Sequence, residues 1–283
     1  MSAQPHPALS LPKLGLGTWR MGESRARRPA EVAAVRRSIE IGYRMIDSAE
    51  MYGEGGAEEV VGIAVAEALR AGDVRRDELT IVSKVYPHNA SRRGTLQACE
   101  RSCQRLRVET IDLYLLHWRG QHALADTVAG MQALVAQGRI RHWGVSNFDV
   151  EDLRELFAAD SATGCAANQV WFSLGERGAE FGLLPWLRDR GMPMVAYSPI
   201  DQGRLSTQRA LADIAAPLGL SAAQLALAWV MAQPGVVAIA KAVQDDHLRD
   251  NWVAAQAVLS ADTLTQLNAL YPPPLRLGAL AMN

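Results

Sequence analysis

Polar side chains follow almost every apolar run in this 283-residue chain, and their types suit acid–base chemistry. The set consists of Asp47, Lys84, His117, the pairs Ser146-Asn147, Asn168-Gln169 and Tyr197-Ser198, and finally Lys241. Tyr52 follows Asp47 by five positions, which lets a loop fold the phenol back beside the carboxylate. A charged group at the end of a buried strand is costly unless it has a partner. We therefore expect these side chains to meet at one site.

Tyr52 and Lys84 form a candidate proton donor for a carbonyl group. A tyrosine has an unperturbed pKa of about 10 and keeps its proton at neutral pH. An ammonium about 4 Å away stabilises the phenolate by roughly 4 kcal/mol at an effective dielectric constant near 20, which corresponds to about 3 pKa units. We therefore expect Lys84 to lower the pKa of Tyr52 toward neutrality while Asp47 holds Lys84 charged. With His117 donating a hydrogen bond to the substrate carbonyl, the set predicts carbonyl reduction by hydride.

The elements that position these residues alternate between short apolar runs and helical patterns. The predicted strands are 14–17, 44–47, 80–85, 111–117, 142–146, 167–170, 194–197 and 236–240. The predicted helices lie near 29–41, 56–71, 92–106, 123–137, 149–159, 181–190, 207–232, 245–257 and 260–271, with the seventh broken at 217–219. Eight strand–helix repeats predict an α/β protein with a (β/α)₈ TIM-barrel fold in one domain, residues 1–283. We expect a β-hairpin within residues 1–12 to close the bottom of the barrel, and a short tail to follow Tyr271.

Glycine-rich loops do not indicate an open dinucleotide-binding sheet. Gly15 and Gly17 begin a Gly-x-Gly-x-x-Gly pattern, but position 20 is Arg20, so the pattern fails. The segment Gly53–Gly56 precedes a helix but lacks the Lys-Ser/Thr pair of a phosphate-binding loop. We interpret it as a turn.

Composition excludes several classes of function. The net charge is −1, with 21% charged and 49% hydrophobic residues, which gives no field for nucleic acid or an anionic membrane. Three cysteines and the lack of closely spaced ligands predict neither a disulfide framework nor a metal site. The apolar run Ala222–Ala240 divides at Pro234-Gly235 and predicts a buried helix and a buried strand rather than a membrane span. The N-terminus shows no export signal, so we predict a cytoplasmic protein.

The order of the motifs resembles the aldo-keto reductases from about Leu14 to Tyr271. The motifs are Asp47-Ser48-Ala49 with Tyr52-Gly53, Ser83-Lys84, Asp112 to Trp118, Gly144 to Phe148, Asn168-Gln169-Val170, Ala196 to Pro199 and Ile239 to Ala242. The combination is specific, although no single motif is. The resemblance implies a (β/α)₈ barrel that binds NADPH in an extended form and reduces aldehydes and ketones to alcohols.

The resemblance also implies a role for each matching residue. Tyr52 corresponds to the general acid, Asp47 and Lys84 to the pair that tunes its pKa, and His117 to the residue that orients the carbonyl. The positions that correspond to cofactor contacts are Gly17 and Thr18 beside the nicotinamide, Ser146, Asn147 and Gln169 at its carboxamide, Tyr197 under its ring, Lys241 and His247 near the 2′-phosphate, and Asp250 and Asn251 at the adenine.

The phosphate-binding segment departs from the family pattern. The family commonly has Pro-Lys-Ser where this chain has Ala240-Lys241-Ala242, and His247 stands where an arginine often binds the phosphate. An imidazole is a weaker phosphate clamp than a guanidinium, which binds through two parallel hydrogen bonds. Because Lys241 remains, we expect NADPH to be preferred over NADH.

Short loops predict an open substrate pocket lined by Trp19, Met51, Tyr86 and Trp118. The loop after the fourth strand spans 118–122 and the tail after Tyr271 is brief, which suits small aldehydes and dicarbonyls. The segment Ser83–Pro87 with His117-Trp118 is most similar to bacterial members that reduce methylglyoxal. We expect a small carbonyl substrate and a monomer or weak dimer.

Two other functions fit parts of the same pattern. A Schiff-base aldolase would use Lys84 as its nucleophile, as lysines at barrel strand ends do elsewhere. A non-catalytic module that binds NADPH and senses redox state would need the cofactor residues alone. The complete set of Asp47, Tyr52, Lys84 and His117 favours the reductase, because a binding module needs no acid.

Overall fold

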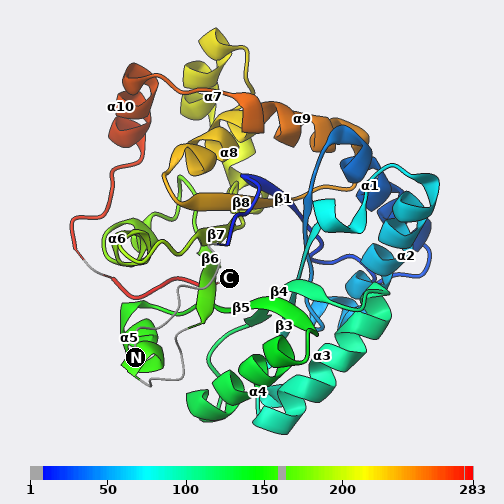
Figure 1. Ribbon diagram of the computed structural model, residues 1–283. Coiled ribbons are helices and arrows are strands. Elements are labelled where there is room, and N and C mark those ends of the chain that lie inside the picture. The colour runs from blue at the N-terminus through cyan, green and yellow to red at the C-terminus, as the bar shows by residue number, and fades with distance from the viewer. Residues whose placement is uncertain (1–8, 159–163, 277, 283) are drawn as a thin grey trace.

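Eight parallel strands close into a barrel in their sequence order, and Figure 1 shows the helices arranged around them. The computed structural model describes residues 9–158, 164–276 and 278–282. The strands are β1 (Leu14–Gly17), β2 (Met45–Asp47), β3 (Thr80–Val85), β4 (Ile111–Leu116), β5 (Ile140–Ser146), β6 (Cys165–Trp171), β7 (Met194–Tyr197) and β8 (Val236–Lys241). Strand β1 pairs with β8 as well as with β2, which closes the ring. The predicted (β/α)₈ barrel is confirmed.

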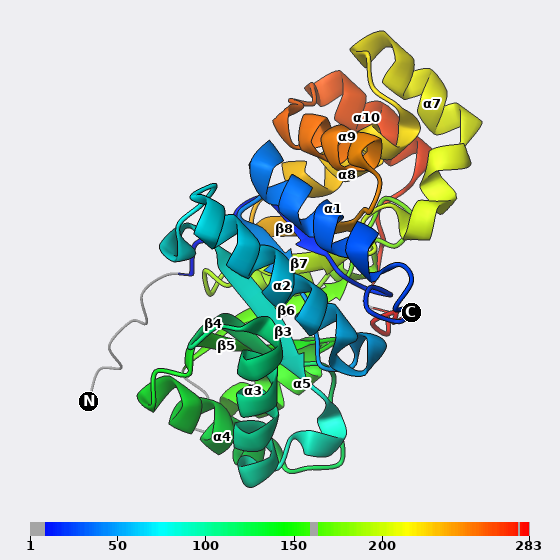
Figure 2. The same cartoon turned by 90° about the vertical axis from the view of Figure 1, so that its right-hand side faces the viewer.

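The described residues form ten α-helices. They are α1 (Arg28–Ile41), α2 (Gly56–Ala71), α3 (Arg92–Leu106), α4 (Leu124–Ala136), α5 (Val150–Ala158), α6 (Leu183–Arg188), α7 (Arg209–Ala215), α8 (Ala222–Ala232), α9 (Asp245–Gln256) and α10 (Ala261–Leu270). In the turned view of Figure 2, α7 to α10 gather on one side of the barrel, and α3 and α4 lie on the other. Serine side chains cap three helix starts, at Ser91, Ser221 and Ser260, by accepting backbone N–H groups of the first turn.

The strands alternate between two cores because successive side chains point to opposite faces. The inner core fills the barrel with Met45, Val82, Leu113, Leu115, Ala167, Val195, Val237 and Ile239. The outer core lies between the strands and the helices and includes Ile46, Ile81, Tyr114 and Leu116. The inward-facing residues at the end of each strand therefore lie at the mouth of the barrel.

Only the last part of the predicted β-hairpin at the bottom of the barrel falls within the described residues. Residues 1–8 of that hairpin lie outside the described residues, and residues 9–12 form no strand. Instead, the side chains of Leu9 and Leu11 pack against the inner core at the start of β1. In the described part of the chain, two leucines from an irregular segment cover the apolar interior that the hairpin was expected to cover.

The long apolar run divides as predicted, into α8 and β8. The helical stretch before it also breaks as predicted, at Gly219 in a left-handed conformation with φ of 68°. Among the described residues, no single helix is long and apolar enough to cross a membrane. One pair, Arg209–Leu218 with Ala222–Ala232, passes by length and composition only when taken together, and it is bent by 78°.

Candidate active site

The predicted site residues continue the inward rows of the strands. Asp47 follows the inner-core residue Met45 by two positions, and Lys84 follows Val82 in the same way. The same spacing relates His117 to Leu115, Gln169 to Ala167, Tyr197 to Val195 and Lys241 to Ile239. Because side chains two apart share a face, the barrel brings these polar groups to its C-terminal mouth, where barrel enzymes place their chemistry.

Lys84 is at the centre of a buried group of side chains that we call the central cluster: Asp47, Tyr52, Lys84, His117 and Gln169. Its Nζ donates to Asp47 Oδ2 at 2.8 Å, to the Ser48 carbonyl at 2.8 Å and to the Tyr52 hydroxyl at 3.2 Å. Gln169 Nε2 donates to the other oxygen of Asp47 at 2.9 Å. The Lys84 side chain is 0% exposed and that of Asp47 is 4% exposed, so each charge depends on the other.

The contact with Lys84 orients the proton of Tyr52. An ammonium only donates hydrogen bonds, so the phenolic oxygen accepts from Lys84 and keeps its own proton for another acceptor. The expectation that Lys84 lowers the pKa of Tyr52 toward neutrality is wrong for this site. Burial raises the pKa of Tyr52 well above 10, and the nearby charge of Asp47 raises it further. Asp47 offsets the charge of Lys84, and Tyr52 is a protonated phenol at neutral pH.

His117 is a buried neutral imidazole beside Tyr52. The two rings lie edge to face with centroids 5.6 Å apart. Burial, and secondly the charge of Lys84, lower the pKa of His117 well below its usual 6.5. Nδ1 is buried and has no hydrogen-bond partner among the described residues. A neutral imidazole has one N–H donor, which suits a hydrogen bond to a carbonyl oxygen.

A second polar group continues around the mouth from β5 to β7. Asn147 follows β5 with φ of 60°, a left-handed conformation that asparagine tolerates. Its Nδ2 donates to the His117 carbonyl at 3.1 Å and to Ser146 Oγ at 3.2 Å. Its Oδ1 accepts from the Tyr197 hydroxyl at 2.9 Å. The structure thus brings the residues predicted for the nicotinamide carboxamide, Ser146, Asn147 and Gln169, next to His117 and Asp47.

The loop after β1 packs directly on the loop that carries Tyr52. Thr18 is buried, and both its backbone N–H and its hydroxyl donate to the carbonyl of Asp47, at 3.0 and 2.9 Å. Gly22 and Gly56 touch through their backbones: a Cβ on Gly22 would lie 2.1 Å from the Gly56 carbonyl carbon. The side chain of Thr18, predicted to contact the cofactor, therefore positions Asp47 in this structure. Gly17 pairs in register with both Asp47 and Lys241.

The residues predicted for the cofactor phosphate and adenine lie at the exposed end of β8 and on α9, a region that we call the rim: Lys241, His247, Asp250 and Asn251. Lys241 and His247 are exposed, and neither side chain has a hydrogen bond or ion pair within the described ranges. Asp250 accepts from Gln224 Nε2 at 3.1 Å, and Asn251 is half-buried in the middle of α9. Asp245, in the first turn of α9, pairs with Arg37 at 2.5 Å and Arg249 at 2.7 Å.

Aromatic rings form a continuous arc across the mouth, which we call the aromatic wall: Trp19, Tyr52, His117, Trp118, Tyr86 and His88. Successive ring centroids along it lie 5.1, 5.6, 4.9, 5.2 and 4.3 Å apart. The structure unites three of the four predicted pocket residues in this wall, and the fourth, Met51, is half-buried one residue before Tyr52. His88 was not predicted, because nothing in its local sequence indicates that the turn Pro87–Asn89 brings it against Tyr86.

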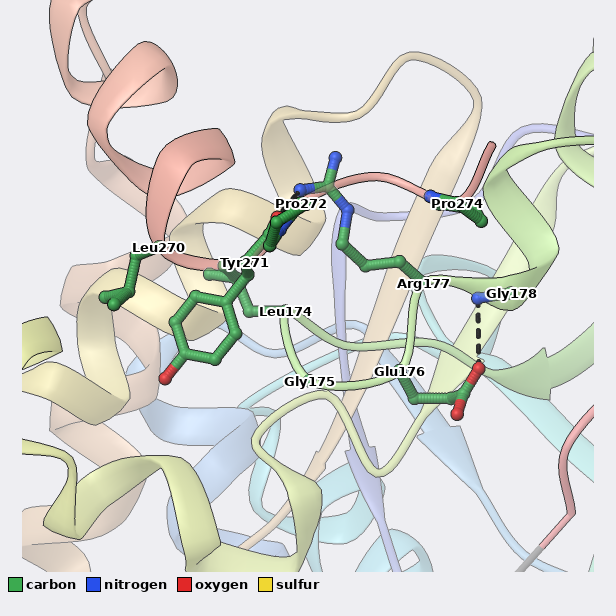
Figure 3. A pocket seen from close by; sticks show the side chains of 9 residues that line it. All are labelled: Leu174, Gly175, Glu176, Arg177, Gly178, Leu270, Tyr271, Pro272 and Pro274. Carbon is green, nitrogen blue, oxygen red and sulfur yellow. Dashed lines mark hydrogen bonds between the residues drawn. The ribbon is translucent and has the colours of Figure 1, made fainter. Parts of the chain in front are cut away.

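A separate pocket of about 330 Å³ lies between the loop after β6 and the C-terminal segment, and Figure 3 shows its lining. Its buried Arg177 donates to Glu180 at 2.6 and 2.8 Å, to Asn268 at 2.9 Å and to the Tyr271 carbonyl. The guanidinium also lies over the ring of Trp229, 4.7 Å from its centroid. These contacts attach the loop to the end of α10. The pocket contains no member of the central cluster.

Comparisons with known proteins agree with the geometry. A sequence model described as "Aldo/keto reductase family" matches residues 13–272. The chain is 46% identical over 279 residues to the methylglyoxal reductase YeaE of Escherichia coli, which covers 97% of this chain and 96% of that protein. It is 34% identical to the glyoxal reductase of Bacillus subtilis, over 94% of this chain and 91% of the relative.

A solved structure has the same fold and a similar sequence. An aldo-keto reductase from Klebsiella pneumoniae, crystallised in complex with NADPH, superposes with a TM-score of 0.90 at 47% identity. The alignment covers 96% of this chain and 95% of that one. Together with the strand-end residues described above, these matches show that this chain belongs to the aldo/keto reductase family.

Proposed function

We propose that the protein reduces small aldehydes and ketones, methylglyoxal among them, to alcohols with NADPH, and that Tyr52 supplies the proton. The observation that carries the proposal is the hydrogen bond from Lys84 Nζ to the Tyr52 hydroxyl, which leaves the phenolic proton for a substrate oxygen. The family membership and the reductases named among the relatives support it.

The donor set at the mouth fits NADPH. Lys241 presents an exposed ammonium at the end of β8, four residues before the first residue of α9, and a helix N-terminus favours phosphate. Ser146, Asn147 and Gln169 offer the hydroxyl and amide groups that a carboxamide requires, beside the ring of Tyr197. When bound, NADPH supplies the hydride that is added to the carbonyl carbon.

The residues of the central cluster supply the proton and orient the substrate. Tyr52 donates its phenolic proton to the carbonyl oxygen, which becomes the hydroxyl oxygen of the alcohol product. Lys84 donates a hydrogen bond to the Tyr52 oxygen and stabilises the negative charge that develops there. Asp47 holds Lys84 in place, and Gln169 donates to the other oxygen of Asp47. His117, neutral at physiological pH, donates a hydrogen bond that orients the carbonyl.

The substrate class follows from the aromatic wall. Trp19 is 44% exposed at one end of the arc, and Tyr86 and Trp118 are half-buried at the other. Such a surface binds small, neutral carbonyl compounds by apolar contact and discriminates weakly between similar ones. Relatives named methylglyoxal reductase and glyoxal reductase support small dicarbonyls as substrates. A cytoplasmic monomer or weak dimer stays a prediction.

The aldolase alternative is disfavoured by the surroundings of Lys84. A Schiff-base nucleophile needs a free lone pair and access to the substrate carbon. The ammonium of Lys84 instead donates three hydrogen bonds, to Asp47, Ser48 and Tyr52, and the side chain is 0% exposed. The non-catalytic alternative gives no reason for a buried ammonium held against a phenol.

The test is NADPH oxidation by the wild-type protein with a panel of small aldehydes, followed by absorbance. We expect oxidation that depends on both aldehyde and protein. Borohydride trapping with methylglyoxal in the same samples addresses the aldolase. The chain has three lysines, Lys13, Lys84 and Lys241, so peptide mapping resolves any adduct. An adduct on Lys84, or NADPH binding without turnover, would overturn the proposal.

A further inference from the structure

We propose that Glu50 is a positioning residue that fixes one end of the aromatic wall and thereby sets how tightly the site holds its carbonyl substrate. Glu50 lies between the catalytic candidates Asp47 and Tyr52 in the sequence. It belongs to none of the motifs that indicate the chemistry of the site. The inference rests on the proposed function, because its readout is the Michaelis constant of the carbonyl compound.

Glu50 carries a carboxylate into a buried place, with only 9% of the residue exposed. Both of its oxygens are used. Oε1 accepts from the backbone N–H of Tyr86 at 2.7 Å and from Asn89 Nδ2 at 3.0 Å, and Oε2 pairs with Arg101 at 3.3 Å. A buried charge is retained where hydrogen bonds compensate its desolvation. All three partners follow β3: Tyr86 and Asn89 lie in the loop that carries the far end of the aromatic wall, and Arg101 lies in α3.

The carboxylate extends the ladder between β2 and β3 beyond the end of β2. Past Asp47, the backbone N–H of Ser48 still donates to the Val82 carbonyl at 2.9 Å, and that of Glu50 to the Lys84 carbonyl at 3.4 Å. In a parallel ladder the next donor, the N–H of Tyr86, would bond to the main-chain carbonyl of Glu50. The side chain of Glu50 takes that place. One residue thus attaches the loop after β3 to the loop that carries Tyr52.

This attachment places Tyr86 in the wall. Tyr86 lies two residues beyond Lys84, on the inward row, so fixing its backbone aims its ring across the mouth. The ring meets Trp118 edge to face at 5.2 Å between centroids, and Trp118 meets His117 at 4.9 Å. Losing the acceptor would leave the part-buried N–H of Tyr86 without its partner and would free the loop to move. Within the described residues, the hydrogen bonds of the Glu50 carboxylate go to Tyr86, Asn89 and Arg101 and not to the central cluster.

The test compares Glu50→Ala with the wild type for methylglyoxal and for phenylglyoxal, whose ring reaches further along the wall. We expect Glu50→Ala to raise the KM for methylglyoxal about tenfold, the size expected when a backbone N–H loses a charged acceptor, and the KM for phenylglyoxal by more. The dissociation constant of NADPH, from quenching of tryptophan fluorescence, should stay within about twofold of wild type, because the rim is unchanged.

Three further variants separate positioning from general damage. Glu50→Gln keeps an oxygen for the Tyr86 N–H and should restore KM to within about threefold of wild type. Glu59→Ala, which removes an ion pair with Arg28 on the neighbouring helix, is the matched control and should leave KM unchanged. Tyr86→Leu should raise KM like Glu50→Ala, and the double variant should add little, because both changes act on the same ring.

The outcomes are distinguishable. A folded Glu50→Ala protein with wild-type KM for both compounds, or with NADPH binding weakened as much as substrate binding, would overturn the inference. If Glu50→Ala does not fold, the Tyr86→Leu variant decides, and an unchanged KM there for both compounds would overturn it. A wild-type protein that does not oxidise NADPH would refute the proposed function instead.

Discussion

The central cluster and the rim differ in how completely the protein organises them by itself. In the cluster, Lys84 is fully buried and hydrogen-bonded to Asp47, Ser48 and Tyr52, and a second layer through Gln169 and Thr18 holds Asp47. On the rim, Lys241 and His247 are exposed to solvent. Preorganised groups act on the transition state, while exposed groups order only when they bind. Changes in the cluster should therefore alter kcat, and changes on the rim should alter cofactor affinity.

The largest expected effect comes from removing the charge at the centre of the cluster. Lys84→Met keeps most of the length of the side chain but leaves Asp47 as a buried charge without its cation and Tyr52 without its donor. We expect kcat for methylglyoxal to fall by about 10²- to 10⁴-fold, the range of one positioned acid–base group. NADPH affinity should change far less. Lys13→Met, at an exposed site before β1, is the matched control and should keep wild-type kcat.

A smaller effect of a different kind is expected on the rim. Lys241→Met removes the exposed ammonium at the end of β8. We expect the dissociation constant of NADPH to rise by about 10- to 100-fold, as for the loss of one charge-assisted phosphate contact, and that of NADH to stay nearly constant. Fluorescence titration with both cofactors measures the difference. Equal loss for NADPH and NADH would show that Lys241 does not read the extra phosphate.

The smallest effect tests whether the rim can be improved. His247→Arg provides a planar guanidinium near Lys241 in the first turn of α9. We expect NADPH to bind about threefold to tenfold tighter, because a guanidinium makes paired hydrogen bonds to a phosphate. The rate of a single turnover at saturating NADPH should not change. A variant with unchanged affinity would indicate that residue 247 points away from the phosphate.

The comparison also shows which parts of the site a sequence predicts. Asp47, Lys84 and His117 were predicted because the period of two along a strand carries the inward row to the mouth once the barrel is recognised. The bounds of the strands were also predicted closely, and those of β1, β3 and β7 agree with the structure at both ends. The direction of the Tyr52 pKa was wrong because it depends on two quantities that spacing does not give. These are the depth of burial of the phenol and its closeness to the charge of Asp47.

Contacts between loops were not predicted, because they too depend on the tertiary structure. Glu50 looks like a solvated loop residue, and its acceptor role follows only from the irregular extension of the β2–β3 ladder. Thr18 matched a cofactor position, yet its hydroxyl donates to the Asp47 carbonyl. At the bottom of the barrel, Leu9 and Leu11 satisfy the apolar interior without forming a strand in the described residues. In each case a local pattern was compatible with several tertiary partners.

The central claim is that a protonated Tyr52, held by Lys84, supplies the proton. Single-turnover reduction of methylglyoxal at saturating NADPH, measured from pH 6 to 9 in wild type and Tyr52→Phe, tests it most directly. Because the phenol must be protonated and its pKa is raised well above 10, the wild-type rate should be level across this range. Tyr52→Phe should be slower by about 10²-fold or more at every pH, with NADPH binding retained. A wild-type rate that falls near neutral pH, or a Tyr52→Phe rate close to wild type, would contradict the account.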